Sequence, residues 1–213
     1  MENRMQKIYS PQDKKVALKA YEGHFATPHS HITHYFDMTT LRTRASEAEA
    51  AARILAEKFG KDVPVDTIVC MDGMTVIGAY LAQELTRAGV PCMNAHETIY
   101  VTEITGEGSG QMLLPGSMIP LVKNKNVMIL TSAVSTGQTL RACMDSVKYY
   151  GGTLSGICSV FSAVRRVAGM EIHTIFTASQ VQDYQSAAGT DCVHCRAGKR
   201  LDAVVNGVRY SEK

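Results

Sequence analysis

Three segments of the chain place apolar residues every three to four positions, which is the pattern of a helix with one buried face. The first begins at Ser46, and Ser46 and Glu49 form the pattern of a capping box. Glycines follow all three segments, at Gly60, Gly89 and Gly151, and commonly end helices. The pattern predicts helices over residues 46–59, 74–88 and 137–150.

Short apolar runs around these helices predict strands. A glycine-rich loop over residues 105–110 separates one run from the segment expected to return as its hairpin partner. Because strand and helix alternate through the middle of the chain, we expect a mainly parallel sheet with helices on both faces. Residues 1–20 are mostly polar and predict a tail with a short helix. The expected strands cover residues 65–71, 98–102, 112–118, 127–130, 154–163 and 172–176.

Composition narrows the class of protein. The 213 residues are 45% hydrophobic and 20% charged, as in globular proteins, and no repeat or linker divides them, so we expect one domain. Because 22 basic and 20 acidic residues leave a charge of only +2, neither nucleic acid nor a membrane surface is the expected partner. The chain has no apolar run of about 18 residues and begins without a signal-peptide pattern, so we expect a cytoplasmic protein.

The cysteines fall into two groups. Cys70, Cys143 and Cys158 lie in apolar segments and should be reduced thiols of the core. Cys192 and Cys195 have the Cys-x-x-Cys spacing of half a zinc site, which His173, His194 or a second copy of the chain could complete. The alternative is that both cysteines are structural and bind no metal.

Residues 127–140 hold the strongest signal of function. An apolar strand leads into a loop of small hydroxylated residues, a glycine and the start of a helix, so that backbone N–H groups and a helix dipole point to one spot. Such a spot binds phosphate. The alternative is a plain strand-to-helix turn with Ser135 or Thr136 as the helix N-cap. The predicted phosphate-binding residues are Ser135, Thr136, Gly137, Gln138 and Thr139.

This stretch resembles the phosphoribosyl diphosphate signature of type I phosphoribosyltransferases: four apolar residues, two acidic residues and a loop ending Thr-Gly-Gly/Gln-Thr. From about His24 to Tyr210 the chain most resembles orotate phosphoribosyltransferase-like proteins. The resemblance implies an α/β fold with a mainly parallel central sheet flanked by helices. It also implies a small hood, from about residues 1–45 and 177–213, over a core of about residues 46–176.

The resemblance further implies a reaction: transfer of phosphoribosyl between diphosphate and a nitrogenous base, a pyrimidine such as orotate, with Mg²⁺ and in a homodimer. The turn from Met71 to Met74 resembles the loop that holds diphosphate, which would assign that role to Asp72 and Gly73. A simple Asp-Gly turn capping the following helix explains the same residues equally well.

The chain departs from the family in two places. Thr131 and Ser132 stand where the acidic pair binds ribose, and hydroxyls offer neutral hydrogen bonds of ~0.5–1.5 kcal/mol instead of ~1.5–3 kcal/mol for charged ones. Residues 101–111 match a mobile basic loop but contain no basic residue, so a hairpin tip is the simpler interpretation. A non-catalytic regulatory module that binds nucleotide or ribose phosphate is therefore the alternative function. A metal- or redox-linked role through Cys192 and Cys195 is a third.

Four histidines cluster near the N-terminus, at His24, His29, His31 and His34. In the resembled enzymes this region covers the base, so the histidines could contact a base together with Tyr35 or Phe36. They could instead be structural or bind a metal. We expect His29 and His31 to share one face of an extended segment, which suits a metal.

Overall fold

The computed structural model describes residues 5–59, 62–87, 94, 98–106, 112–205 and 210–212. Its centre is a five-stranded sheet in which all neighbouring strands run parallel. The strand order is β12 (His173–Thr177), β9 (Thr153–Ser162), β8 (Asn126–Val134), β4 (Thr67–Cys70) and β5 (Tyr100–Glu103). The predicted α/β fold with a mainly parallel sheet is confirmed.

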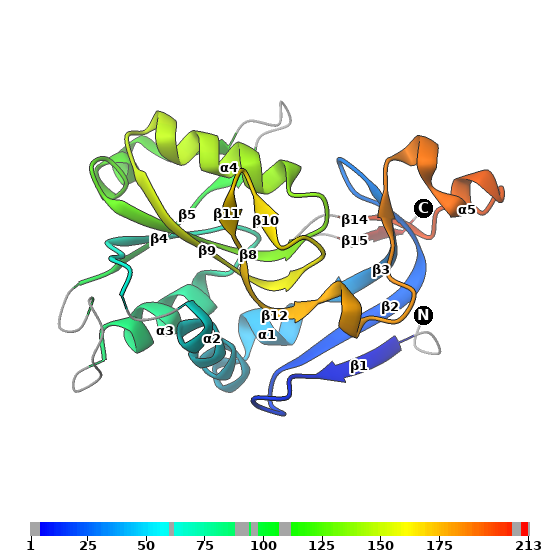
Figure 1. The fold of residues 1–213 in the computed structure, drawn as a ribbon, viewed down its shortest axis with the longest axis horizontal. Coiled ribbons are helices and arrows are strands. Elements are labelled where there is room, and N and C mark those ends of the chain that lie inside the picture. The colour runs from blue at the N-terminus through cyan, green and yellow to red at the C-terminus, as the bar shows by residue number, and fades with distance from the viewer. Residues whose placement is uncertain are drawn as a thin grey trace.

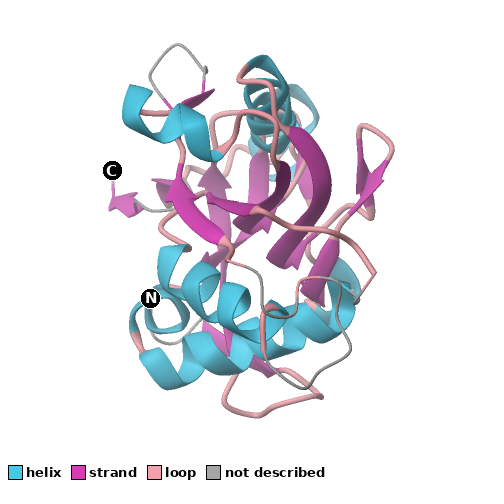
Figure 2. Ribbon diagram, turned by 90° about the vertical axis from the view of Figure 1, so that its left-hand side faces the viewer, coloured by secondary structure: helices cyan, strands magenta, loops and turns pink. Residues whose placement is uncertain are grey.

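Helices cover both faces of the central sheet, as Figures 1 and 2 show. On one face lie α2 (Ala45–Phe59) and α3 (Thr75–Leu85), with the short α1 (Thr39–Thr43) beside them. On the other face lies α4 (Gln138–Tyr149). Side chains alternate along β4, so Ile68 joins the core under α2 and α3 while Val69 joins the core under α4.

Both ends of the chain build a second sheet, which we call the terminal sheet. Its order is β13 (Ser186–Ala187), β3 (His31–Asp37), β2 (Ala17–Ala26), β14 (Ala203–Val205) and β15 (Tyr210–Glu212), and β1 (Met5–Tyr9) pairs with β2. The predicted tail with a short helix is wrong. Val16, Leu18 and Ala20 point inward at every second position, which is the period of a strand.

Short elements connect the strands of the two sheets. Two hairpins form, β6 (Thr105–Gly106) with β7 (Met112–Leu113), and β10 (Arg166–Val167) with β11 (Met170–Glu171). The strand expected over 112–118 is therefore short, because a 3-10 helix, η2 (Gly116–Leu121), follows Pro115. The remaining elements are η3 (Ala178–Gln180), η4 (Gly189–Asp191) and α5 (Val193–Arg196).

The helix boundaries differ from the prediction at two points. Helix α3 ends at Leu85 and does not reach residue 88. Helix α2 begins at Ala45, and the amides of Glu47 and Ala48 donate to the carbonyl of Arg44, so Ser46 lies inside the helix and the capping box does not form. Gly60, residues 89–91 and much of the glycine-rich loop lie outside the described residues. No helix among the described residues is long and apolar enough to cross a membrane.

Candidate functional site

The loop between β8 and α4 has the geometry of an anion site. Strand β8 continues to Val134, and Gly137 is the N-cap of α4 with a φ of 82°, where a side chain would be strained. A Cβ atom on Gly137 would lie only 2.5 Å from a methyl group of Val167 in the β10–β11 hairpin. The hairpin therefore packs directly behind the loop, and glycine is required for both reasons.

The side chains of this loop are available to a ligand. Thr136, Gln138 and Thr139 are exposed, and no side chain caps α4, so the alternative with Ser135 or Thr136 as N-cap is wrong. Ser135 is half-buried, with its hydroxyl 3.5 Å from that of Ser30 in the terminal sheet. The first amides of a 12-residue helix need acceptors, and a phosphate can supply them.

Asp72 places a carboxylate beside Thr131 and Ser132 of β8. Its Oδ2 accepts hydrogen bonds from the hydroxyls of Thr131 and Ser132, each at 2.8 Å, and from the Ser132 amide at 3.3 Å. Thr131 and Ser132 are buried, so Asp72 is the neighbour that satisfies them. A carboxylate thus lies at the position where the sequence shows only hydroxyls.

The turn that carries Asp72 has an unusual backbone. Asp72 and Gly73 have φ values of 55° and 70°, and the Met74 amide donates to the Met71 carbonyl at 3.1 Å. The Asp-Gly turn therefore forms, but no side chain caps α3. The guanidinium of Arg42 on α1 donates to the Asp72 carbonyl at 2.9 Å and holds the turn in place.

The loop over residues 135–139, which was predicted to bind phosphate and is called the phosphate loop below, faces the same cleft as the Asp72 turn. The volume of this cleft is about 650 Å³. Residues from the terminal sheet, including Thr27, His29 and Tyr35, form its opposite wall. The β6–β7 hairpin contributes Thr105, Gly106 and Met112. The cleft therefore lies between the central and terminal sheets, with Asp72 and the residues predicted to bind phosphate and ribose at its floor. Gly73, which was predicted to bind diphosphate, is not among its lining residues.

Aromatic rings form one wall of the cleft. Phe36 on β3 packs against Phe161 near the end of β9, with ring centroids 4.2 Å apart. Tyr184 stacks on Phe36, with ring centroids 5.7 Å apart. Burial raises the pKa of the Tyr184 phenol, so the hydroxyl stays neutral. This wall can stack on a planar base.

The charged side chains that line the cleft are acidic. Asp72 and Glu103 line it, and no lysine or arginine is found among its described lining residues. An anion bound here would depend on backbone amides, hydroxyls and the α4 dipole. Behind the floor, burial raises the pKa of the Cys143 thiol to about 12, with a smaller contribution from the Asp72 carboxylate. Cys70, Cys143 and Cys158 are buried and free, as predicted.

The structure divides the four histidines into three groups. His29 lines the cleft, and His34 is buried beside Tyr184, with ring centroids 6.1 Å apart. His24 and His31 lie together next to Cys192 and Cys195. His29 precedes β3 in a turn, so it does not share a strand face with His31 as predicted.

Known proteins share the fold of this chain. No protein-family model matches the chain. It is similar to orotate phosphoribosyltransferase of Mycobacterium tuberculosis, with a TM-score of 0.51 and 13% identity over 78% of this chain and 93% of that one. It is similar to adenine phosphoribosyltransferase of Rhodothermus marinus, with a TM-score of 0.50 and 14% identity over 83% and 95% of the two chains. The fold is that of the type I phosphoribosyltransferases.

Sequence comparison gives two relatives that match about half of the chain. The bifunctional protein PyrR of Citrifermentans bemidjiense and that of Geobacter sp. strain M21 are each 29% identical over 126 residues, 54% of this chain and 68% of the relative. The orotate and adenine enzymes match this phosphoribosyltransferase fold almost equally, with TM-scores of 0.51 and 0.50, so the fold does not distinguish the base.

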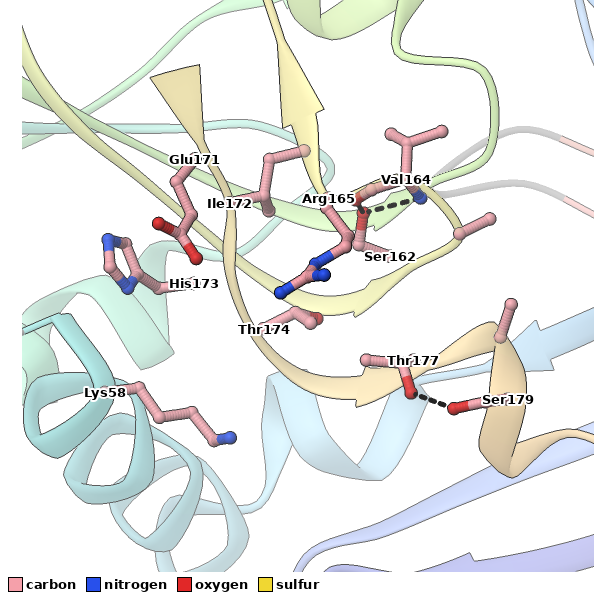
Figure 3. A pocket seen from close by; sticks show the side chains of 12 residues that line it. Lys58, Ser162, Val164, Arg165, Glu171, Ile172, His173, Thr174, Thr177 and Ser179 are labelled. Carbon is pink, nitrogen blue, oxygen red and sulfur yellow. Dashed lines mark hydrogen bonds between the residues drawn. The ribbon is translucent and has the colours of Figure 1, made fainter. Parts of the chain in front are cut away.

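A second hollow of about 500 Å³ lies on the other side of β9, beside the edge strand β12. Figure 3 shows Lys58, Arg165, Glu171 and His173 spread around it from separate elements. The 135–139 loop and Asp72 do not line it, so it is separate from the cleft between the two sheets. His173 packs against Phe59 and is remote from the cysteine pair it was expected to join.

Proposed function

We propose that this chain binds a ribose 5-phosphate compound in the cleft and transfers phosphoribosyl between diphosphate and a pyrimidine base. The observation that carries the proposal is the meeting of three parts in one cleft: the loop with Gly137, the Asp72 carboxylate and the aromatic wall. Each part suits one portion of a nucleotide, namely phosphate, ribose and base.

The phosphate end of the ligand is assigned to Ser135, Thr136, Gly137, Gln138 and Thr139. Their amides and hydroxyls would donate to the phosphate oxygens, supported by the α4 dipole. The ribose would then lie over Thr131 and Ser132, beside Asp72. Asp72 and Gly73 also remain our candidates for the diphosphate side of the site.

Asp72 has a clear chemical task in this reaction. When the bond from C1′ to diphosphate breaks and the bond from C1′ to a ring nitrogen forms, positive charge develops on the ribose. A carboxylate fixed by three hydrogen bonds stabilises that charge without reorganising. Asp72 would thereby supply part of what the missing acidic pair supplies in the resembled enzymes.

The family's Mg²⁺ fits the oxygen donors of the cleft. Magnesium is held by one or two carboxylates together with substrate phosphates, and Asp72 and Glu103 both line the cleft. When bound, the ion would neutralise diphosphate charge, which otherwise meets these two acidic side chains without a lysine or arginine among the described lining residues.

The base is assigned to the wall formed by Phe36, Phe161 and Tyr184, with Tyr35 and His29 nearby. Orotate is the base that the resemblance implies. Orotate carries a carboxylate, however, and the described lining offers only His29 as a basic side chain. Uracil, which has the same ring without that charge, is therefore the essential comparison in any assay.

One observation favours a second function, a non-catalytic regulatory module that binds a nucleoside monophosphate. Thr131 and Ser132 both donate to Asp72, so in this structure their hydroxyl protons are already engaged and Asp72 shares its charge with them. Such a module would bind nucleotide saturably without any chemistry.

An assay of diphosphate release separates the two functions. Purified protein with Mg²⁺ and phosphoribosyl diphosphate is tested against orotate, uracil, adenine and hypoxanthine, and calorimetry with uridine monophosphate is run beside it. Turnover with a pyrimidine supports transfer. Saturable binding of uridine monophosphate with no turnover of any base supports the module. If the protein shows neither turnover nor binding, both proposed functions lose their support. We also propose, from the resemblance, that the chain forms a homodimer. Sedimentation of the same sample measures this oligomeric state.

A further inference from the structure

Four side chains of the kind that bind transition metals meet at one corner of the terminal sheet. His24 lies on β2, His31 is the first residue of β3, and Cys192 and Cys195 flank the first turn of α5. One ligand atom from each lies within 4.8 Å of the other three. Residues 168 positions apart, Cys192 and His24, are thus brought together by the fold.

The distances between the four ligand atoms are close to those around a tetrahedral ion, with two inside the expected range and two slightly below it. His24 Nε2 lies 3.0 Å from His31 Nδ1, 3.4 Å from Cys192 Sγ and 3.6 Å from Cys195 Sγ, and Cys195 Sγ lies 3.2 Å from His31 Nδ1. Zinc bonds of ~2.0–2.1 Å to nitrogen and ~2.3 Å to sulfur place tetrahedral ligand atoms roughly 3.3–3.8 Å apart. The four atoms therefore surround a space of the size of one bound ion.

Hydrogen bonds alone do not account for this arrangement. His24 Nδ1 lies 3.0 Å from the carbonyl of Lys199, and because a carbonyl only accepts, Nδ1 carries the ring proton. His24 Nε2 then has a single lone pair, yet three polar groups approach it. A cation at the centre satisfies all four ligand atoms at once. A backbone carbonyl on the opposite ring nitrogen is also the usual support of a metal-binding histidine.

We propose that His24, His31, Cys192 and Cys195 bind one zinc ion. Two thiolates and two imidazoles are a donor set that zinc favours, and four protein ligands fill its tetrahedron, so the role is structural. The backbone around the site is itself fixed, because the Asp202 carboxylate accepts from the His24 amide at 2.7 Å. The site is separate from the Mg²⁺ of the cleft.

The zinc would hold two parts of the terminal sheet together. It joins the segment around α5 to the β2–β3 hairpin, whose turn supplies Thr27 and His29 to the cleft and Ser30 next to Ser135. The ion would therefore fix one wall of the cleft. An effect on ligand affinity rests on the function proposed above, whereas zinc binding itself does not.

The test uses the full chain, purified without a histidine tag, reduced and then dialysed with zinc. We expect about one zinc per chain, and reconstitution with cobalt should give the intense visible absorption of a tetrahedral site with thiolate ligands. Cys195→Ser and His31→Asn should lose most of the metal. His194→Gln is the matched control, because His194 lies beside His24 but is not one of the four ligands.

Two results would overturn the proposal: reduced wild-type protein with no zinc after dialysis, or equal zinc in Cys195→Ser and His194→Gln. If the variants do not fold, two measurements on the wild-type chain test the site: the cobalt spectrum and the melting temperature with a chelator. We expect thiolate absorption in the first and a lower melting temperature in the second. A wild-type chain that shows neither effect counts against the site. Binding of uridine monophosphate is measured separately, so a failure of the zinc site is distinguished from a failure of the cleft.

Discussion

At the scale of single residues, the site depends on a contact between two strand ends. Asp72 follows β4, Thr131 and Ser132 lie near the end of β8, and these strands are neighbours in the sheet. The carboxylate accepts both hydroxyls and one amide, which fixes its position. The reaction that we propose needs negative charge at this point, so Asp72 is the residue whose charge matters most.

Replacing Asp72 by Asn removes the charge and keeps the size. The amide meets two hydroxyl donors with one oxygen, and a charged hydrogen bond becomes a neutral one, which costs ~1–1.5 kcal/mol. We expect kcat/KM for phosphoribosyl transfer to fall about tenfold or more, while inorganic phosphate binds unchanged. Steady-state kinetics and calorimetry measure the two effects. Unchanged kcat/KM in an active enzyme would remove Asp72 from the reaction.

The hydroxyls of the phosphate loop allow a second prediction. Thr136→Val and Thr139→Val each remove one donor while keeping the volume, so each should weaken binding of ribose 5-phosphate by about 2- to 10-fold. Thr153→Val, an exposed threonine at the start of β9, is the control and should bind normally. Calorimetry gives the three affinities, and equal values in all three would mean that the phosphate lies elsewhere.

The sequence indicates some of these residues and not others. The loop from Ser135 to Thr139 is contiguous, so its pattern is visible in the chain. The contact of Asp72 with Thr131 spans 59 positions, and that of His24 with Cys195 spans 171, and pairings of that kind follow only from the fold. Tyr184 lies in a connecting segment without a periodic pattern, and no signal in the sequence marks it as part of the cleft.

At the scale of elements, the β10–β11 hairpin supports the phosphate loop. Gly137 has a positive φ, and Val167 on the hairpin leaves no space for a side chain there. The loop therefore keeps its shape through both its own backbone and the hairpin behind it.

Gly137→Ala tests this support. A left-handed alanine costs ~1–2 kcal/mol and the contact with Val167 adds to it, so we expect the melting temperature to fall by roughly 2–8 °C and phosphate binding to weaken. In Gly137→Ala with Val167→Ala, the overlap is relieved but the φ strain stays, so only part of the loss should return. Thermal unfolding measures both. Full recovery of the melting temperature in the double variant would show that the positive φ at position 137 does not contribute to the loss of stability.

The elements follow the sequence best where their period is local and regular. Helices α3 and α4 and the strands of the central sheet lie close to their predicted ranges. Strands β13, β14 and β15 of the terminal sheet were missed because they have only two or three residues each. Strand β1 and the start of β2 were missed because residues 1–20 were assigned to a tail with a short helix. Capping was also misjudged at Ser46, since α1 leads almost directly into α2 and supplies the first acceptor from Arg44.

At the scale of the whole molecule, aromatic packing joins the two sheets. Phe161 ends β9 of the central sheet and contacts Phe36 of the terminal sheet and Tyr184, with ring centroids 4.2 and 5.1 Å apart. These rings also line the cleft. The division into hood and core stays a proposal, and this contact is where the two parts would be coupled.

Phe161→Ala should lower the stability of the fold and remove one of the rings that line the cleft. Phe161 is fully buried, and truncation of such a ring costs ~3–5 kcal/mol. We expect a clear fall in the free energy of unfolding in urea. Tyr149→Ala is the control, since Tyr149 is 84% exposed and should change stability by less than about 0.5 kcal/mol. A Phe161→Ala variant as stable as the control would show that this contact does not hold the sheets together.

The most direct test of the central claim is a crystal structure of the chain with ribose 5-phosphate bound. We expect phosphate oxygens within ~2.7–3.2 Å of the amides of the 135–139 loop, and the ribose hydroxyls beside the Asp72 carboxylate. Phosphate bound at any other place, or a cleft that stays without ligand when the compound is saturating, would contradict it.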